Sequence, residues 1–201
     1  NKILTAVSSG TGPDVLSLGT TWTASLPDTG AFAELDDANL EAMGGSDRFV
    51  STVFEAAHVP DTVQTAVPLL SNVYSLYYNT TLFEEAGIDA PPATWEEFVD
   101  VAEKLTKDTD DDGKIDQWGF SREAAAATGN AHFAFILGEQ LGGSFVDAEG
   151  NPTIDTPEQV KATEAFVGLM SEQKVMAPNN AEIDLGADAN DQMINGESAM
   201  I

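Results

Sequence analysis

Near the middle of the chain, acidic side chains recur at the spacing of a calcium-binding loop. The segment 108–116 reads DTDDDGKID, with carboxylates at loop positions 1, 3, 5 and 9 and a glycine at position 6 for the sharp turn. Neighbouring carboxylates repel one another unless a cation neutralises them. The ligands that this spacing predicts for a structural Ca²⁺ are Asp108, Asp110, Asp112, the carbonyl oxygen of Lys114, and Asp116.

Two features weaken the comparison with a calcium-sensor loop. Position 12, where such loops carry a bidentate glutamate, is Gly119. The residues after the loop read as a strand, so only one side has a convincing helix. The alternative interpretation, a solvated acidic turn in a very acidic protein, stays open.

The sequence carries no recognisable catalytic signature. It lacks a GxSxG motif, a P-loop and a His/Glu zinc motif, and its two histidines, His58 and His132, are not at ligand-like spacing. Without cysteine there are no thiolate nucleophiles or thiolate metal sites. The 34 acidic residues guarantee many carboxylate pairs, so the presence of a pair suited to a glycosidase is no evidence for that activity. We predict a binding protein without an organic cofactor, not an enzyme.

The net charge narrows the range of partners. Eight basic residues against 34 acidic ones give a formal charge of −26. Such a surface repels nucleic-acid phosphates and anionic lipids, so neither is expected to bind. The same acidity is typical of proteins kept soluble in high salt.

The elements that would position these residues alternate between strands and helices. Apolar runs predict strands over 13–18, 64–70, 73–78 and 198–201. Capping signals predict helices that start at Thr94 and Thr156, and a further helix is predicted over 131–141, with Asn130 a good N-cap. The alternation indicates an α/β fold. Both ends of the sequence read as interruptions inside a fold.

Several segments, in order, resemble bacterial extracellular solute-binding proteins of the maltodextrin-binding type. These segments are SGTGPDV (9–15), VP (67–68) with LYYN (76–79), LFEEAGI (82–88), PPATWEEF (91–98), LGG (141–143) and GESAM (196–200). The resemblance implies a type II periplasmic-binding-protein-like fold of two lobes, incomplete at both ends. Residues 1–70 would be part of the first lobe and 71–201 most of the second, with the hinge crossing near 67–79.

The resemblance also implies a mechanism, in which two lobes close over a sugar or oligosaccharide held by aromatic faces and polar side chains. It implies an extracytoplasmic protein that delivers its solute to an ABC-transporter permease. The residues expected to contact the solute are Thr20, Thr21, Trp22, Asn72, Tyr74, Asn130 and His132. The competing functions are a calcium-stabilised extracellular interaction domain and a carbohydrate-active enzyme.

Overall fold

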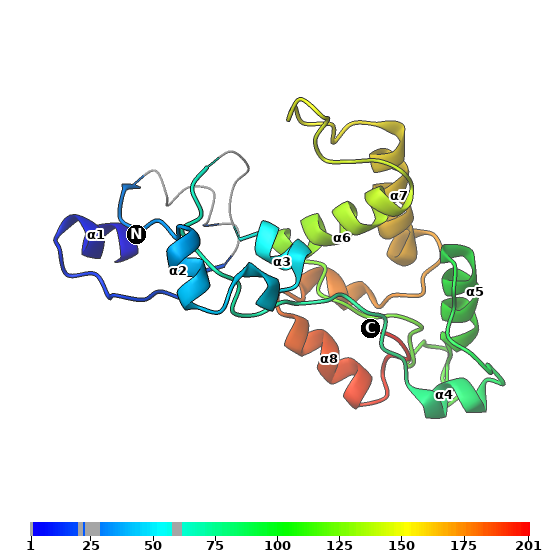
Figure 1. Cartoon of the computed structure of the whole chain (residues 1–201). Coiled ribbons are helices and arrows are strands. Elements are labelled where there is room, and N and C mark those ends of the chain that lie inside the picture. The colour runs from blue at the N-terminus through cyan, green and yellow to red at the C-terminus, as the bar shows by residue number, and fades with distance from the viewer. Residues whose placement is uncertain (1, 20–21, 23–28, 58–61) are drawn as a thin grey trace. The chain divides into compact units, whose positions relative to one another are not determined.

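The computed structural model of the chain describes residues 2–19, 22, 29–57 and 62–201 (Figure 1). It divides into two compact units, Asn1–Tyr74 and Ser75–Ile201. The assignment of residues 1–70 to a first lobe and 71–201 to a second, with a crossing near 67–79, stays a prediction.

The first unit consists of short helices joined by long irregular segments. Its helices are α1 (Lys2–Ser8), α2 (Asp37–Ala42), the 3₁₀ helix η3 (Ser46–Arg48) and α3 (Ser51–Glu55). Asp36 caps α2 by accepting a hydrogen bond from the Asn39 amide at 2.8 Å. The strands predicted over 13–18 and 64–70 are wrong, because neither segment forms a strand. Their apolar side chains, such as Val15 and Leu69, are largely exposed instead of packed against a neighbouring strand.

The second unit contains longer helices and most of the buried side chains. Its elements are α4 (Thr80–Glu85), α5 (Trp95–Leu105), α6 (Ala127–Gln140), α7 (Pro157–Ser171), the 3₁₀ helix η4 (Pro178–Glu182) and α8 (Gly186–Ile194). Helices α6 and α7 pack side by side (Figure 1).

Both predicted capping signals are confirmed. At α5, the Thr94 hydroxyl oxygen accepts from the Glu97 amide at 3.1 Å, and the Glu97 carboxylate accepts from the Ala93 amide at 2.7 Å. At α7, the Thr156 hydroxyl oxygen accepts from the Gln159 amide, with Pro157 in the first turn. These bonds satisfy amides that a helix start would otherwise leave unpaired.

The predicted start of α6 is wrong by about one turn. The helix begins at Ala127 rather than Ala131, and its N-cap position, Ala126, makes no side-chain cap. Asn130 therefore lies inside the helix and is not its N-cap. Its amide donates to the Ala126 carbonyl at 2.9 Å, an ordinary helical bond.

The β structure of the second unit consists of isolated bridges between distant segments. Residues 199–201 lie between two other segments. On one side Tyr77 and Ile201 exchange backbone hydrogen bonds of 2.9 and 3.0 Å, and on the other the Ala199 amide donates to the Trp118 carbonyl at 2.9 Å. A further bridge joins Phe120 to Met176. The predicted strands 73–78 and 198–201 therefore appear only as isolated bridges, which pair Tyr78 with Met200 and Trp118 with Ser198.

The core of the second unit packs helices against this bridged layer. Its wholly or almost wholly buried apolar residues come from α4, α5 and α7 and from the bridged segments: Phe83, Phe98, Ala102, Leu105, Phe120, Leu169, Val175, Met176, Ala199 and Met200. Phe98 meets Phe120 edge to face, with ring centroids 5.1 Å apart. Among the described residues, no helix has both the length and the apolar character needed to cross a membrane.

Candidate functional site

The acidic loop 108–116 is closed at its base and draws three carboxylates together. Lys107 and Gln117 pair across the base, with the Lys107 amide donating to the Gln117 carbonyl at 2.8 Å and the Gln117 amide returning a bond of 3.1 Å. One carboxylate oxygen from each of Asp108, Asp110 and Asp116 lies within 4.8 Å of the others. The predicted spacing therefore places three of the four predicted carboxylates together.

Asp112 does not join this group. Its carboxylate accepts hydrogen bonds from the Lys114 amide at 2.8 Å and from the Lys114 ammonium at 3.2 Å. Its own backbone amide donates to Asp108 at 3.2 Å and to Asp110 at 3.1 Å. The loop thus places backbone donors on the carboxylates, which offset part of their mutual repulsion.

Asp116 is held by Thr109. The Thr109 hydroxyl donates to one carboxylate oxygen at 2.7 Å and the Thr109 amide to the other at 3.0 Å. These hydrogen bonds, the side-chain bond first, lower the pKa of Asp116 below its usual value. The carboxylate is therefore ionised and fixed in orientation at neutral pH.

A packing contact explains the departure at loop position 12. A Cβ atom on Gly119 would lie 2.1 Å from the Ala102 carbonyl oxygen, in the last turns of α5. No side chain, and so no glutamate, fits there without moving α5. The bidentate ligand of sensor loops is therefore excluded by the fold of the second unit.

The solute-contacting residues predicted in the first unit are described only in part. Thr20 and Thr21 lie outside the described residues. Trp22 is 46% exposed and Tyr74 is 58% exposed, and Asn72 is exposed as well. Exposed aromatic rings of this kind can lie against the C–H face of a sugar. The solute contact of Trp22, Asn72 and Tyr74 stays a prediction.

In the second unit, Asn130 and His132 share the first turns of α6. His132 is exposed. The Asn130 side-chain amide donates to the Ala124 carbonyl at 2.9 Å, while its amide oxygen is buried without a hydrogen-bond partner. Residues two apart on a helix do not face each other. Asn130 thus ties the helix to the preceding loop, and the predicted solute contact of both residues is untested.

Sequence reasoning missed the partly buried ion pair beside these residues. Arg122 is only 6% exposed, and its guanidinium lies 3.4 Å from the Glu123 carboxylate. It also lies 4.4 Å from the ring centroid of Phe133 and 5.3 Å from that of Phe166. One signal was available in the sequence, because Arg122 is one of only two arginines in a chain of charge −26.

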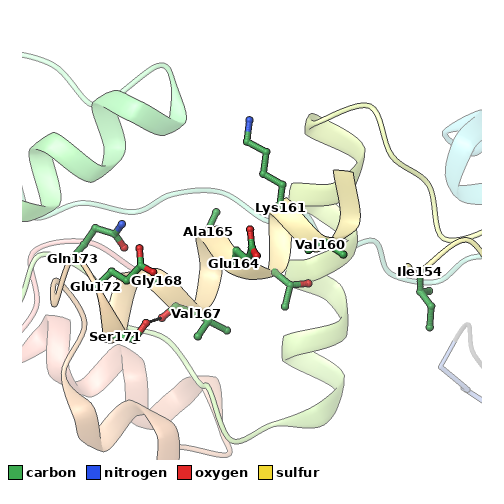
Figure 2. A pocket seen from close by; sticks show the side chains of 11 residues that line it. Ile154, Val160, Lys161, Glu164, Ala165, Val167, Gly168, Ser171, Glu172 and Gln173 are labelled. Carbon is green, nitrogen blue, oxygen red and sulfur yellow. Dashed lines mark hydrogen bonds between the residues drawn. The ribbon is translucent and has the colours of Figure 1, made fainter. Parts of the chain in front are cut away.

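A surface hollow among the described residues lies elsewhere and does not resemble a binding site. It runs along α7, has a volume of about 730 Å³ and contains none of the predicted solute-contacting residues. Figure 2 shows its lining side chains, among them Lys161, Val167 and Gln173, pointing to different sides of the helix. A binding site needs polar groups that converge on a ligand, and these do not.

Comparison with known proteins adds to this geometry. The chain matches the model of the family described as "Bacterial extracellular solute-binding protein" over residues 1–201. A putative binding protein of Brucella abortus (strain 2308) is 25% identical over 171 residues, which make up 85% of this chain and 39% of that protein. The arabinooligosaccharide-binding protein of Halalkalibacterium halodurans is 26% identical over 125 residues, 62% of this chain and 26% of that protein.

Solved structures show the same relationship. The maltose-bound MalE3 of T. maritima superposes with a TM-score of 0.76 at 28% identity, covering 98% of this chain and 48% of that one. The chain therefore spans about half the length of this structure and less of the curated relatives. The expected fold class, α/β of the type II periplasmic-binding-protein kind, is confirmed, and the chain corresponds to about half of it. The chain belongs to the bacterial extracellular solute-binding protein family.

Proposed function

We propose that the protein captures a neutral sugar or oligosaccharide outside the cytoplasm and delivers it to an ABC-transporter permease, without chemical conversion. The observation that carries this proposal is the family match over residues 1–201. The arabinooligosaccharide-binding relative and the maltose-bound structure support a carbohydrate as the solute.

The charges of the chain favour a neutral solute over a phosphorylated one. A phosphate group is held best by arginine forks. The chain has two arginines, and Arg122 is buried against Glu123. Arg48 donates to the backbone carbonyl of Met43. Only Arg48 is exposed, and one of its guanidinium nitrogens is already engaged with this carbonyl. The overall charge of −26 opposes an anionic guest.

The solute contacts proposed are Trp22 and Tyr74 as aromatic platforms and Asn72 and His132 as polar groups. Thr20, Thr21 and Asn130 complete the set implied by the family resemblance. Their support is exposure and residue type: Trp22 is 46% exposed and Tyr74 58% exposed, and His132 is exposed on the first turns of α6.

Calorimetry on the full-length protein tests the proposal with maltose, an arabinooligosaccharide and glucose 6-phosphate. We expect binding of a neutral sugar, no binding of the phosphorylated sugar and no new product after prolonged incubation. Trp22→Ala should weaken binding about tenfold or more, since an aromatic contact contributes of the order of 1 kcal/mol beyond its buried area. Asn72→Ala should also weaken it, whereas Asn190→Ala, an exposed asparagine of α8, should not. Sugar turnover would instead support a carbohydrate-active enzyme.

A structural Ca²⁺ in the loop 108–116 stays a prediction. It is supported by the grouping of Asp108, Asp110 and Asp116 and by the fixed carboxylate of Asp116. Hard cations prefer such oxygen ligands. Asp112 and the Lys114 carbonyl would complete the predicted set after the Asp112 carboxylate leaves Lys114. Without a ligand at Gly119, we expect a stabilising ion and not a switch.

A further inference from the structure

Arg122 makes its contacts with three different parts of the second unit. Its guanidinium donates to the Gly129 carbonyl in the first turn of α6 at 3.0 Å. The Nε atom donates to the Glu123 carbonyl at 3.2 Å, and the guanidinium faces the Phe133 and Phe166 rings of α6 and α7. Arg122 therefore fastens the start of α6 to the chain just before it and to α7.

The segment that carries Arg122 is itself firmly held. The Ala124 amide donates to the Asn180 carbonyl at 3.1 Å, and the Ala125 amide donates to the Ile183 carbonyl at 2.9 Å. Asn180 is fully buried in η4 and donates to Gln192 of α8 at 2.8 Å. The loop before α6 is thus anchored to η4, and the Arg122–Gly129 bond extends this anchor to the helix.

The first turn of α6 is packed so closely around Gly129 that a larger side chain at this residue would displace the groups that hold the turn. A Cβ atom on Gly129 would lie 2.8 Å from the Glu123 carboxylate and 3.2 Å from the Arg122 guanidinium. No side chain caps α6 at Ala126, and Arg122 does not replace a cap, because the unpaired groups of a helix start are amides that need acceptors. Arg122 holds the first turn through its bond to the Gly129 carbonyl instead. A buried guanidinium is a strong donor because its charge strengthens each hydrogen bond it makes.

We propose that Arg122 is a positioning residue for solute binding, which fixes the first turns of α6 and so the orientation of His132. This inference rests on the proposed function. A contact group that is held in place before the solute arrives loses less conformational entropy on binding, so affinity rises without any new contact. Arg122 itself is buried and touches no solute.

Three variants of the full-length protein test the inference. Arg122→Met keeps an apolar stem and removes all guanidinium donors, and Arg122→Lys keeps one charged donor without the fork. Lys104→Met, on the exposed side of α5, is the matched control for the loss of one positive charge. The measurements are amide hydrogen exchange in peptides covering 127–132, exchange in α5 as an internal reference, and calorimetric affinity for the neutral sugar that the wild type binds.

In Arg122→Met we expect exchange over 127–132 to accelerate about tenfold or more, since a hydrogen bond to a charged donor is among the stronger ones. Exchange in α5 should not change. The sugar affinity of Arg122→Met should fall about tenfold. The exchange rate and the affinity of Arg122→Lys should lie between those of Arg122→Met and the wild type, and those of Lys104→Met should match the wild type. If Arg122→Met does not fold, the same comparison is made with Arg122→Lys.

Two results would overturn the inference: unchanged exchange over 127–132 in a folded Arg122 variant, or accelerated exchange with unchanged affinity. Failure of the proposed function is distinguishable, because then the wild type itself binds no carbohydrate. In that case the role of Arg122 in solute binding is rejected with it. The exchange data still decide whether Arg122 fixes the start of α6.

Discussion

Gly119 lies against the backbone of Ala102, so close that a Cβ atom at residue 119 would stand 2.1 Å from the Ala102 carbonyl oxygen. The contact is reinforced by Thr106, whose hydroxyl donates to that same carbonyl at 2.8 Å and accepts from the Gly119 amide at 3.0 Å. The end of α5 and the segment after the acidic loop are thus joined backbone to backbone. This junction lies next to the Lys107–Gln117 pair that closes the base of the loop.

Gly119→Ala should therefore destabilise the protein by about 3 kcal/mol, the upper part of the usual range for forcing extra atoms into a packed core. Chemical denaturation measures the change. Gly186→Ala is the control, because its new Cβ would meet Glu123 at 3.5 Å, an ordinary contact. Equal stability of the two variants would contradict the close packing at Ala102.

Calcium should raise the melting temperature if the loop 108–116 binds it. Replacing Asp108 and Asp112 together by Asn should abolish that increase, because two of the predicted ligand charges are lost. Asp147→Asn, in an exposed turn outside the loop, is the control and should keep it. Differential scanning calorimetry with calcium or with chelator gives the answer. Identical melting of the wild type in both conditions would reject the site.

Asp147 provides a prediction for acid pH. The Asn151 side chain donates to both carboxylate oxygens, at 3.2 and 2.9 Å, and the Asn151 amide donates at 2.8 Å. These bonds, the side-chain bond first, lower the pKa of Asp147 in the folded protein. When folding lowers the pKa of a carboxyl group, that group stabilises the folded state at any pH above its pKa in the unfolded chain. The contribution is lost as the pH falls through the lower pKa of the folded protein.

In Asn151→Ala, the pKa of Asp147 should therefore rise towards the usual value of about 3.9, as seen by NMR titration of the carboxyl carbon. The stability difference between variant and wild type should be present at neutral pH and disappear in strong acid. The pKa of Asp116, whose partner is Thr109, should not move. A stability difference that stays constant from neutral pH to strong acid would contradict the role of Asn151 in lowering the pKa of Asp147.

Salt should stabilise the protein. With a formal charge of −26, self-repulsion opposes the compact state, and the Debye length falls from about 10 Å at 0.1 M salt to about 3 Å at 1 M. We expect the midpoint of thermal unfolding to rise over this range. Replacing exposed acids such as Glu164 by Gln should reduce the slope. Full stability without added salt would remove this explanation of the acidic composition.

Local signals predicted the parts of the fold that local interactions determine. The starts of α5 and α7 follow from Thr94 and Thr156, whose hydroxyl groups act within three residues. Three of the four loop carboxylates also converge as their spacing predicted. In each case the interacting residues are close in sequence, so their types and spacing are enough to predict the interaction.

Interactions between distant residues account for the errors. The helix predicted from residue 131, with Asn130 as its N-cap, begins at Ala127. The Gly129 carbonyl in its first turn is held by Arg122, seven residues earlier in the chain. The run 13–18 has the composition of a strand, but a strand also requires a partner segment, and none pairs with it among the described residues. The spacing of the acidic residues also did not predict that the Asp112 carboxylate would bond with Lys114 instead of joining the other carboxylates.

The pairing of Tyr77 with Ile201 has a consequence for the order of folding. The segment 199–201 lies between segments that come much earlier in the sequence, near Tyr77 and Trp118. Helices α5 and α7 can form before these pairings do, because their caps join residues only three apart. Contacts between residues so remote in sequence form slowly, so the bridged layer should be the last part of the second unit to become ordered during refolding.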